Sequence, residues 1–237
     1  RRDITELHYK RPMGTLAVRV LDANLQLPTH NRIHLTASDG KLYVPNDAYA
    51  RAGSRGDLIF HNNGTFELTL PVGEVRLTAV KGFEFTPTEV EVDIEEGEIV
   101  QLTIELSRLT DMGAKGWYSA STHVHSNYGG NLHNTLENLM MMSRAEDQDL
   151  VLEQVANKDN RILDYHYFEP GGVAHSVSEE DQIVVVGQEY RPPFYGHVFM
   201  FGLKEHLISP FVTGYEGTAI ESLYPSNTDM LLKAKAQ

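Results

Sequence analysis

Two histidines separated by a single residue have the clearest chemical potential in this sequence. His123 and His125 end the apolar and aromatic stretch 117–125. If this stretch is a β-strand, side chains two positions apart point to the same side. Two imidazoles would then leave one face together, and neutral imidazole is the commonest metal ligand in proteins. The pair predicts a metal site, and the alternative is two partly exposed histidines on a strand.

Two further candidate ligands follow later in the chain. Glu189 comes directly after the β-branched run 182–187, at the strand end where α/β folds place their chemistry. Pairing with Arg191 or simple loop exposure is the alternative. His197 opens the apolar run 198–203, so its side chain can point into a pocket, although a lone histidine there is more often structural.

Three polar residues are weaker candidates for catalysis. Lys158 and Asp159 belong to the dense polar run 157–161, which a plain turn explains equally well. Lys158 and Arg191 carry positive charge that could hold an anionic or oxyanionic group. Asp159 could supply an oxygen ligand or a hydrogen bond to substrate. Three aromatic residues could form an apolar wall for substrate, although ordinary loop packing is favoured: Tyr190, Phe194 and Tyr195.

The composition excludes several kinds of function. The net charge of −13 argues against a nucleic-acid partner, because binding to phosphates needs a basic surface. The absence of cysteine excludes disulfides, thiolate metal sites and cysteine nucleophiles. No apolar run approaches the ~20 residues that span a bilayer, so we expect no membrane insertion. Walker, nucleophile-elbow and His-Glu-x-x-His motifs are absent from the sequence. A small-molecule substrate remains the expected partner.

The first half of the chain has the pattern of an all-β sandwich. Alternating segments rich in β-formers are separated by turns, and they predict about seven short strands. The segment 44–61 is less regular and is expected to be a long loop. Asn63-Gly64 predicts a tight turn, and His61 is expected at the surface. The clearest predicted strands are 14–21, 31–37, 65–70, 74–80, 88–94 and 99–106.

The second half alternates strands with helices and predicts an α/β unit. Helices are expected over 135–145 and 227–237. Strands are expected over 117–125, 150–156, 182–187 and 198–203. The predicted organisation is an N-terminal extension, a β-sandwich, a linker and an α/β domain, with the ranges 1–13, 14–108, 109–116 and 117–237.

The second half resembles the PHP superfamily of metallohydrolases, in its carbaryl-hydrolase-like branch. The match rests on three short motifs: His123-Val124-His125-Ser126, Gly187-Gln188-Glu189 and Gly196-His197. The resemblance implies that His123 and His125 bind one divalent ion, that Glu189 bridges two ions, and that His197 binds the second. Nitrogen and oxygen ligands suit Zn, Mn or Fe. The implied reaction is attack of a metal-activated water on an ester, amide, carbamate or phosphoester.

The same resemblance implies a distorted β/α barrel, of which residues 117–237 are the N-terminal portion. Members of the superfamily supply further ligands from later strands, so we expect a truncated barrel here. Some members of the superfamily hold a third ion. At the positions that match the motifs of those members, this chain has Ser121 and the run 157–160 instead. The full-length protein is therefore expected to be the active form, and the activity of these 237 residues alone is left open.

The first half resembles the carboxypeptidase-regulatory-like sandwich, which is related to transthyretin. The match rests on two phrases, residues 14–22 and residues 63–73. Such modules are common outside the cytoplasm, so the resemblance implies a periplasmic or secreted location. It also leaves a rival function open. The sandwich could bind carbohydrate or protein without catalysis, with a degenerate PHP-like half as its support.

Overall fold

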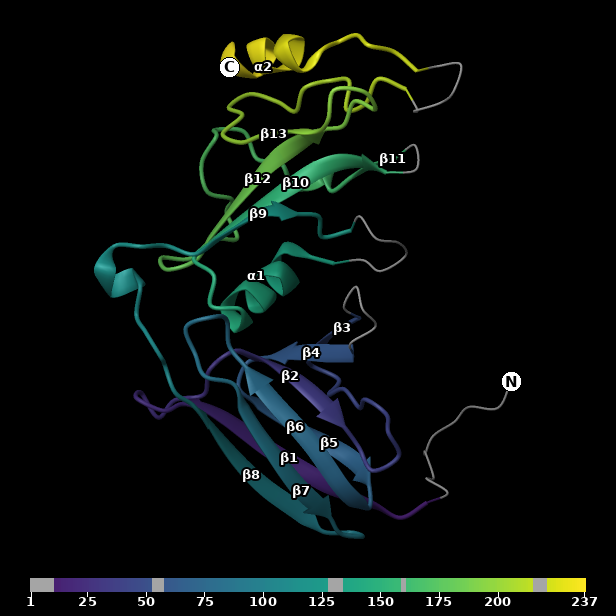
Figure 1. Cartoon of the computed structure of the whole chain (residues 1–237), viewed down its shortest axis with the longest axis vertical. Coiled ribbons are helices and arrows are strands. Elements are labelled where there is room, and N and C mark those ends of the chain that lie inside the picture. The colour runs from purple at the N-terminus through teal and green to yellow at the C-terminus, as the bar shows by residue number, and fades with distance from the viewer. Residues whose placement is uncertain (1–10, 53–57, 128–133, 159–160, 215–220) are drawn as a thin grey trace. The chain divides into compact units, whose positions relative to one another are not determined.

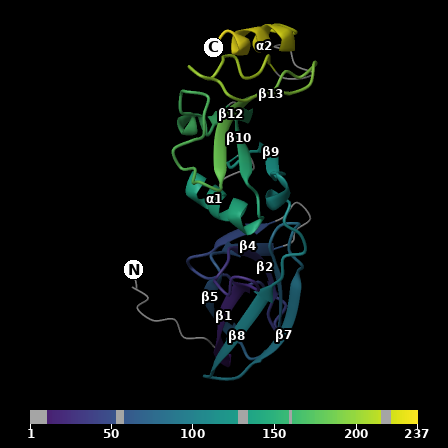
Figure 2. The same cartoon turned by 90° about the vertical axis from the view of Figure 1, so that its left-hand side faces the viewer.

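The chain divides into two compact units in the computed structural model, which describes residues 11–52, 58–127, 134–158, 161–214 and 221–237. The first unit comprises residues 1–117 together with 144–147, and the second comprises residues 118–143 and 148–237. Figures 1 and 2 show the elements of each unit from two directions. We describe each unit by itself.

The described part of the first unit has two β-sheets. One has the strand order β5-β1-β8 and the other the order β3-β4-β2-β6-β7. Strands β1 and β8 are parallel, and the other paired strands are antiparallel. The bounds are β1 Met13–Asp22, β2 Asn31–Thr36, β3 Tyr49–Ala52, β4 Leu58–Asn62, β5 Thr65–Pro71, β6 Gly73–Val80, β7 Thr88–Ile94 and β8 Ile99–Leu106. A short 3₁₀ helix, η1 (Gly113–Lys115), follows.

Alternating side chains from both sheets form one core, which makes this unit a β-sandwich. Leu16 on β1, Phe66 on β5 and Leu77 on β6 are buried in the same cluster. Along each of these strands, buried residues alternate with more exposed ones that face outward. This is the arrangement expected when two sheets pack face to face. The predicted β-sandwich character is therefore shown.

The prediction of a long loop over 44–61 is wrong, because this segment contains β3 and all but the last residue of β4. Tyr49 pairs with His61 and Ala52 with Leu58, so β3 and β4 form an antiparallel edge of the larger sheet. His61 is also not at the surface. It is 2% exposed, and its Nε2 lies 3.0 Å from Oε1 of Glu146, within the same unit.

The expected turn at Asn63-Gly64 is present between β4 and β5. Gly64 has a φ of +101°, which disfavours any side chain. A Cβ at this position would also lie 2.6 Å from the backbone nitrogen of Thr29. The turn therefore requires glycine at its second residue.

The second unit is built on a mixed sheet with the strand order β11-β10-β12-β13, and β9 also pairs with β10. Strands β9, β10 and β12 are parallel, whereas β11 and β13 are antiparallel to their neighbours. The bounds are β9 Ala120–Val124, α1 Leu136–Ala145, β10 Leu150–Lys158, β11 Arg161–Leu163, η2 Tyr165–Tyr167, β12 Ile183–Tyr190, β13 Val198–Met200 and α2 Asn227–Lys235. The strands and helices predicted for this half are present, with shifted ends.

The helices of the second unit pack on different parts of its core. Leu139 and Met140 of α1 pack with Val151 and Val184 of the sheet. In α2, Met230 packs with Tyr190. Both views show α1 and α2 at opposite ends of this unit (Figures 1 and 2).

Helix α2 begins with a reciprocal capping interaction. The Ser226 side chain accepts a hydrogen bond from the backbone N–H of Asp229, and the Asp229 carboxylate accepts one from the backbone N–H of Ser226. Among the described residues, no helix has both the length and the apolar character needed to cross a membrane.

Candidate metal centre

The parallel strands of the second unit bring the predicted ligands to one edge of the sheet. His123 lies on β9 and His125 directly follows that strand. Glu189 is the penultimate residue of β12, so it lies within the strand rather than after it. The carboxyl ends of parallel strands meet at the same edge, which is where open α/β sheets bind ligands. This explains how residues more than 60 positions apart become neighbours.

The two imidazoles of the His-x-His pair converge. His123 Nε2 lies 3.0 Å from His125 Nε2. The side chain of His123 is 54% exposed, whereas that of His125 is 14% exposed. His125 Nδ1 lies 2.9 Å from the backbone carbonyl oxygen of Gln154, which only a protonated Nδ1 can satisfy. In the neutral ring this leaves the lone pair on Nε2, the atom that faces the cluster.

Glu189 completes a three-residue group of possible metal ligands. Its Oε2 lies 3.1 Å from His125 Nε2, and its Oε1 lies 4.0 Å from His123 Nε2. One ligand atom from each residue lies within 4.8 Å of the others. The Glu189 side chain is 2% exposed, and no well-directed hydrogen bond reaches its buried Oε2.

The charge of Glu189 is set by two opposing effects. Burial raises the pKa of this carboxyl, but the contact with His125 and the positive charge of Arg191 lower the pKa by more. The net effect is a pKa below the usual value, so the group is ionised at neutral pH. An ionised oxygen with free lone pairs is the form that binds a cation.

His197 joins the group through the other carboxylate oxygen of Glu189. Its Nδ1 lies 2.7 Å from Oε1, whereas His125 faces Oε2. The side chain of His197 is 43% exposed. The glutamate therefore has an imidazole on each oxygen, and the structure brings all four predicted metal ligands together.

The three weaker catalytic candidates have different outcomes. Arg191 lies beside the cluster, with its Nε 3.5 Å from Glu189 Oε2, and its Nη1 donates to the carbonyl oxygen of Asn157 at 2.9 Å. These contacts make Arg191 a charge partner of Glu189. Lys158 is the last residue of β10, but its side chain lies outside the described residues, as does all of Asp159.

Tyr190 belongs neither to an apolar wall for substrate nor to a loop, as the sequence suggested, because it is the last residue of β12. This residue is 0% exposed and its hydroxyl donates to the carbonyl oxygen of Pro225, so it belongs to the core. Phe194 and Tyr195 are exposed and contact each other edge to face. Sequence reasoning missed the aromatic residue that contacts the centre, Phe199, whose ring centroid lies 4.4 Å from that of His123.

Sequence reasoning also missed the residues behind the histidine pair. Glu153 is 0% exposed and accepts hydrogen bonds from Ser126, the residue after His125. The available signal was a charged residue inside the apolar run 150–156, since a buried charge needs a specific partner.

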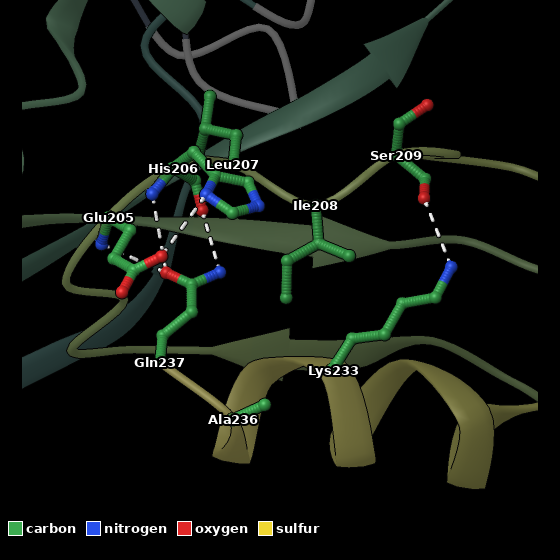
Figure 3. Close-up of a pocket in the computed structure, with 8 residues that line it drawn as sticks. All are labelled: Glu205, His206, Leu207, Ile208, Ser209, Lys233, Ala236 and Gln237. Atoms are coloured by element: carbon green, nitrogen blue, oxygen red, sulfur yellow. Dashed lines mark hydrogen bonds and ion pairs between the residues drawn. The ribbon is translucent and has the colours of Figure 1, made fainter.

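A separate open cavity of about 490 Å³ lies between residues 205–209 and the end of α2 (Figure 3). Gln237 lines it, and its Oε1 accepts hydrogen bonds from the backbone N–H groups of Glu205 and His206. Lys233 Nζ lies 3.5 Å from the Ser209 carbonyl oxygen. None of the four candidate metal ligands lines this cavity.

The residues of the cluster fit a divalent cation. Two imidazole nitrogens and an ionised carboxylate form a nitrogen and oxygen donor set without sulfur, which suits Zn, Mn or Fe. The carbonyl oxygen of Gln154 behind His125 is the kind of outer contact that orients a metal-binding imidazole. Nitrogen and oxygen lone pairs this close to one another repel, and a cation bound between them would turn this repulsion into attraction.

Comparisons with known proteins do not assign a family. No protein-family model matches the chain, and no curated protein matches it. Among solved structures, the minor pilin GBS52 of Streptococcus agalactiae is 18% identical, with a TM-score of 0.31 over 43% of this chain and 47% of the pilin. BcpA, the major pilin subunit of Bacillus cereus, is 18% identical, with a TM-score of 0.28 over 41% and 30%.

A DUF3823 family protein from Parabacteroides merdae is 20% identical, with a TM-score of 0.27 over 42% of this chain and 48% of that protein. The matches span less than half the length of each of these solved structures.

Proposed function

We propose that this protein is a metal-dependent hydrolase whose cation is held by His123, His125 and Glu189. One observation carries the proposal: three lone-pair donors, two from the end of β9 and one from β12, converge within 4.8 Å. The pattern of motifs that resembles the PHP superfamily supports the same assignment. The finer fold, a PHP-type distorted barrel, is part of the proposal.

His197 extends the proposal to a second cation. Its Nδ1 faces Oε1 of Glu189, while Oε2 faces His125. This division supports a bridging role for the carboxylate between two cations. We therefore propose that the site holds up to two divalent ions, with Zn, Mn or Fe as the candidates.

The residues of the chain have distinct roles in this scheme. The Gln154 carbonyl keeps the proton of His125 on Nδ1. Arg191 holds negative charge on Glu189 and fixes the end of β12 against Asn157 of β10. A divalent ion held there would supply Lewis acidity, which polarises a carbonyl or phosphoryl oxygen and makes water nucleophilic near neutral pH. The half-exposed His123 ring places this chemistry where a small-molecule substrate can reach it.

Hydrolytic activity is expected to depend on divalent metal. The protein should cleave at least one of four model substrates, an aryl ester, an anilide, an aryl carbamate or an aryl phosphate, after loading with Zn²⁺ or Mn²⁺. A chelator should abolish the rate, and added metal should restore it. Release of the coloured leaving group measures both effects.

A metal-loaded protein that cleaves none of these four bonds would contradict the hydrolase assignment. That result would favour the rival function, a β-sandwich that binds carbohydrate or protein without catalysis. Product analysis separates a phosphatase from an esterase or amidase. The resemblance of the sandwich to extracytoplasmic modules leads us to propose a periplasmic or secreted location.

A further inference from the structure

A fully buried carboxyl group lies at the centre of β10. Glu153 is 0% exposed, and its neighbours Val151 and Val155 are core residues that pack with α1. Taking a carboxylate out of water costs free energy unless it is paired or remains protonated. Packing alone therefore does not explain why a carboxyl group is buried at position 153.

The hydrogen bonds of Glu153 lead to the residue that follows His125. The Ser126 backbone N–H lies 3.0 Å from Oε1 and 3.2 Å from Oε2, and the Ser126 hydroxyl donates to Oε2 at 2.8 Å. Burial raises the pKa of Glu153 to about 8, although the hydrogen bonds from Ser126 oppose this shift. The carboxyl is thus mostly protonated at neutral pH.

A second buried carboxyl group, Asp164, lies beside the first. It is 6% exposed, and its charge and its hydrogen bond with Glu153 both raise the pKa of Glu153. Asp164 also accepts hydrogen bonds from the backbone N–H of Asn127 at 3.2 Å and from its side-chain amide at 2.6 Å. Glu153 and Asp164 together hold Ser126 and Asn127.

The residue after Glu153 holds the imidazole itself. The Gln154 carbonyl oxygen accepts a hydrogen bond from Nδ1 of His125. Two consecutive residues of β10 therefore fix His125 in two ways, through its ring and through the backbone that follows it. Nε2 of His125 is left 3.1 Å from Oε2 of Glu189.

We propose that Glu153 is a positioning residue for the candidate metal centre, and that its buried carboxyl group, which contacts Ser126, keeps His125 Nε2 directed at Glu189. The effect on metal affinity rests on the proposed function, whereas the effect on the His125 ring does not require a metal. Residues that orient a metal-binding histidine typically change metal affinity about 10- to 100-fold when they are lost.

Three variants of the full chain test this role by Zn²⁺ affinity, measured in competition with a chromophoric chelator. Glu153→Leu should bind Zn²⁺ about 10- to 100-fold more weakly than the parent protein. Glu153→Gln keeps an uncharged acceptor of similar shape for Ser126, and because that hydrogen bond is retained, its affinity should remain within about 3-fold of the parent.

Gln182→Leu is the matched control for loss of a buried polar group. Gln182 is 4% exposed, and its side chain donates to Ser143 Oγ and to the Gln148 carbonyl oxygen, not to the histidine segment. This variant should be destabilised without a change in Zn²⁺ affinity. If Glu153→Gln loses as much affinity as Glu153→Leu, or if Glu153→Leu loses no more than the control, the positioning role is wrong.

Nitrogen-15 NMR of the imidazoles in metal-free protein gives a readout that does not depend on Zn²⁺. The parent protein and Glu153→Gln should keep the His125 proton on Nδ1, whereas Glu153→Leu should show a mixture of tautomers. A change of tautomer in a protein that binds no Zn²⁺ would support positioning and reject the proposed function. An unchanged tautomer in Glu153→Leu would overturn the positioning role.

If Glu153→Leu does not fold, Ser126→Ala replaces it. This variant removes only the 2.8 Å hydroxyl bond to Glu153 and should weaken Zn²⁺ binding about 5-fold, the factor that corresponds to about 1 kcal/mol. Full affinity in Ser126→Ala, with the parent tautomer at His125, would count against the proposal.

Discussion

Replacing both His123 and His125 with alanine is expected to abolish the binding of divalent metal at the candidate centre. The double variant leaves only Glu189 of the three converging donors, with His197 on its other oxygen, and we expect these two ligands to hold a cation too weakly to survive dialysis. The loss of affinity should exceed the roughly 10- to 100-fold effect of losing an outer contact. Elemental analysis after dialysis against limiting Zn²⁺, together with a Zn²⁺ titration, measures it.

The matched control removes two imidazoles elsewhere in the same unit. His166 and His206 are exposed and are not part of the cluster, so the double alanine variant at these positions should keep the metal content of the parent. An unchanged metal stoichiometry in the His123 and His125 variant would mean that the ion binds elsewhere. The metal-centre assignment would then be lost.

The second large effect is expected on stability, and it depends on pH. Burial raises the pKa of Glu153 from the usual 4.5 to about 8. The stability that the protonated carboxyl gives the fold is fully present below pH 4.5, where both states are protonated. It is lost progressively as pH rises from 4.5 to 8, because only the unfolded state ionises in this range.

Glu153→Gln should therefore be more stable than the parent protein at neutral pH. The difference should be less than about 1 kcal/mol at pH 5 and on the order of 3 kcal/mol at pH 7. Urea unfolding followed by circular dichroism at several pH values measures the difference. Glu205→Gln is the control, since the Glu205 side chain is 67% exposed and its removal should change stability equally little at each pH. A Glu153→Gln difference that does not grow between pH 5 and pH 8 would show that the carboxyl is not buried and protonated.

The local pattern of the sequence predicted much of the secondary structure. Alternation in strands such as β1 and β5 follows directly from a half-buried sheet surface, so it is visible without knowing the partners. The apolar run before Glu189 similarly predicted β12. Strands β3 and β4 were missed because their sequence does not alternate regularly. They are strands because they pair with each other at the edge of the larger sheet, and local sequence does not reveal this pairing.

The candidate site was predictable where chemistry and spacing coincide. A His-x-His pair at the end of a strand points its rings to one side whatever the rest of the fold does. The supporting residues were not predictable in this way. Glu153 contacts Ser126 only because β9 and β10 are adjacent and parallel, and Tyr190 was misjudged because its exposure depends on Met230, far along the chain.

The division of contacts at Glu189 has a consequence for metal stoichiometry. Oε2 of Glu189 faces His125 and Oε1 faces His197. An ion bound by His123, His125 and Glu189 therefore does not need His197 as a ligand. A His197→Ala variant separates the two positions without removing the central donors. The number of ions that the protein binds is therefore a separate question from whether the first ion binds.

The central claim is that His123, His125 and Glu189 surround one divalent cation, and X-ray absorption at the zinc edge of the Zn²⁺-loaded protein tests it most directly. The account predicts saturable binding and a nitrogen and oxygen shell near 2.0–2.2 Å, with the outer scattering of at least two imidazoles. A protein that takes up no Zn²⁺, or a zinc shell without imidazole scattering, would contradict it.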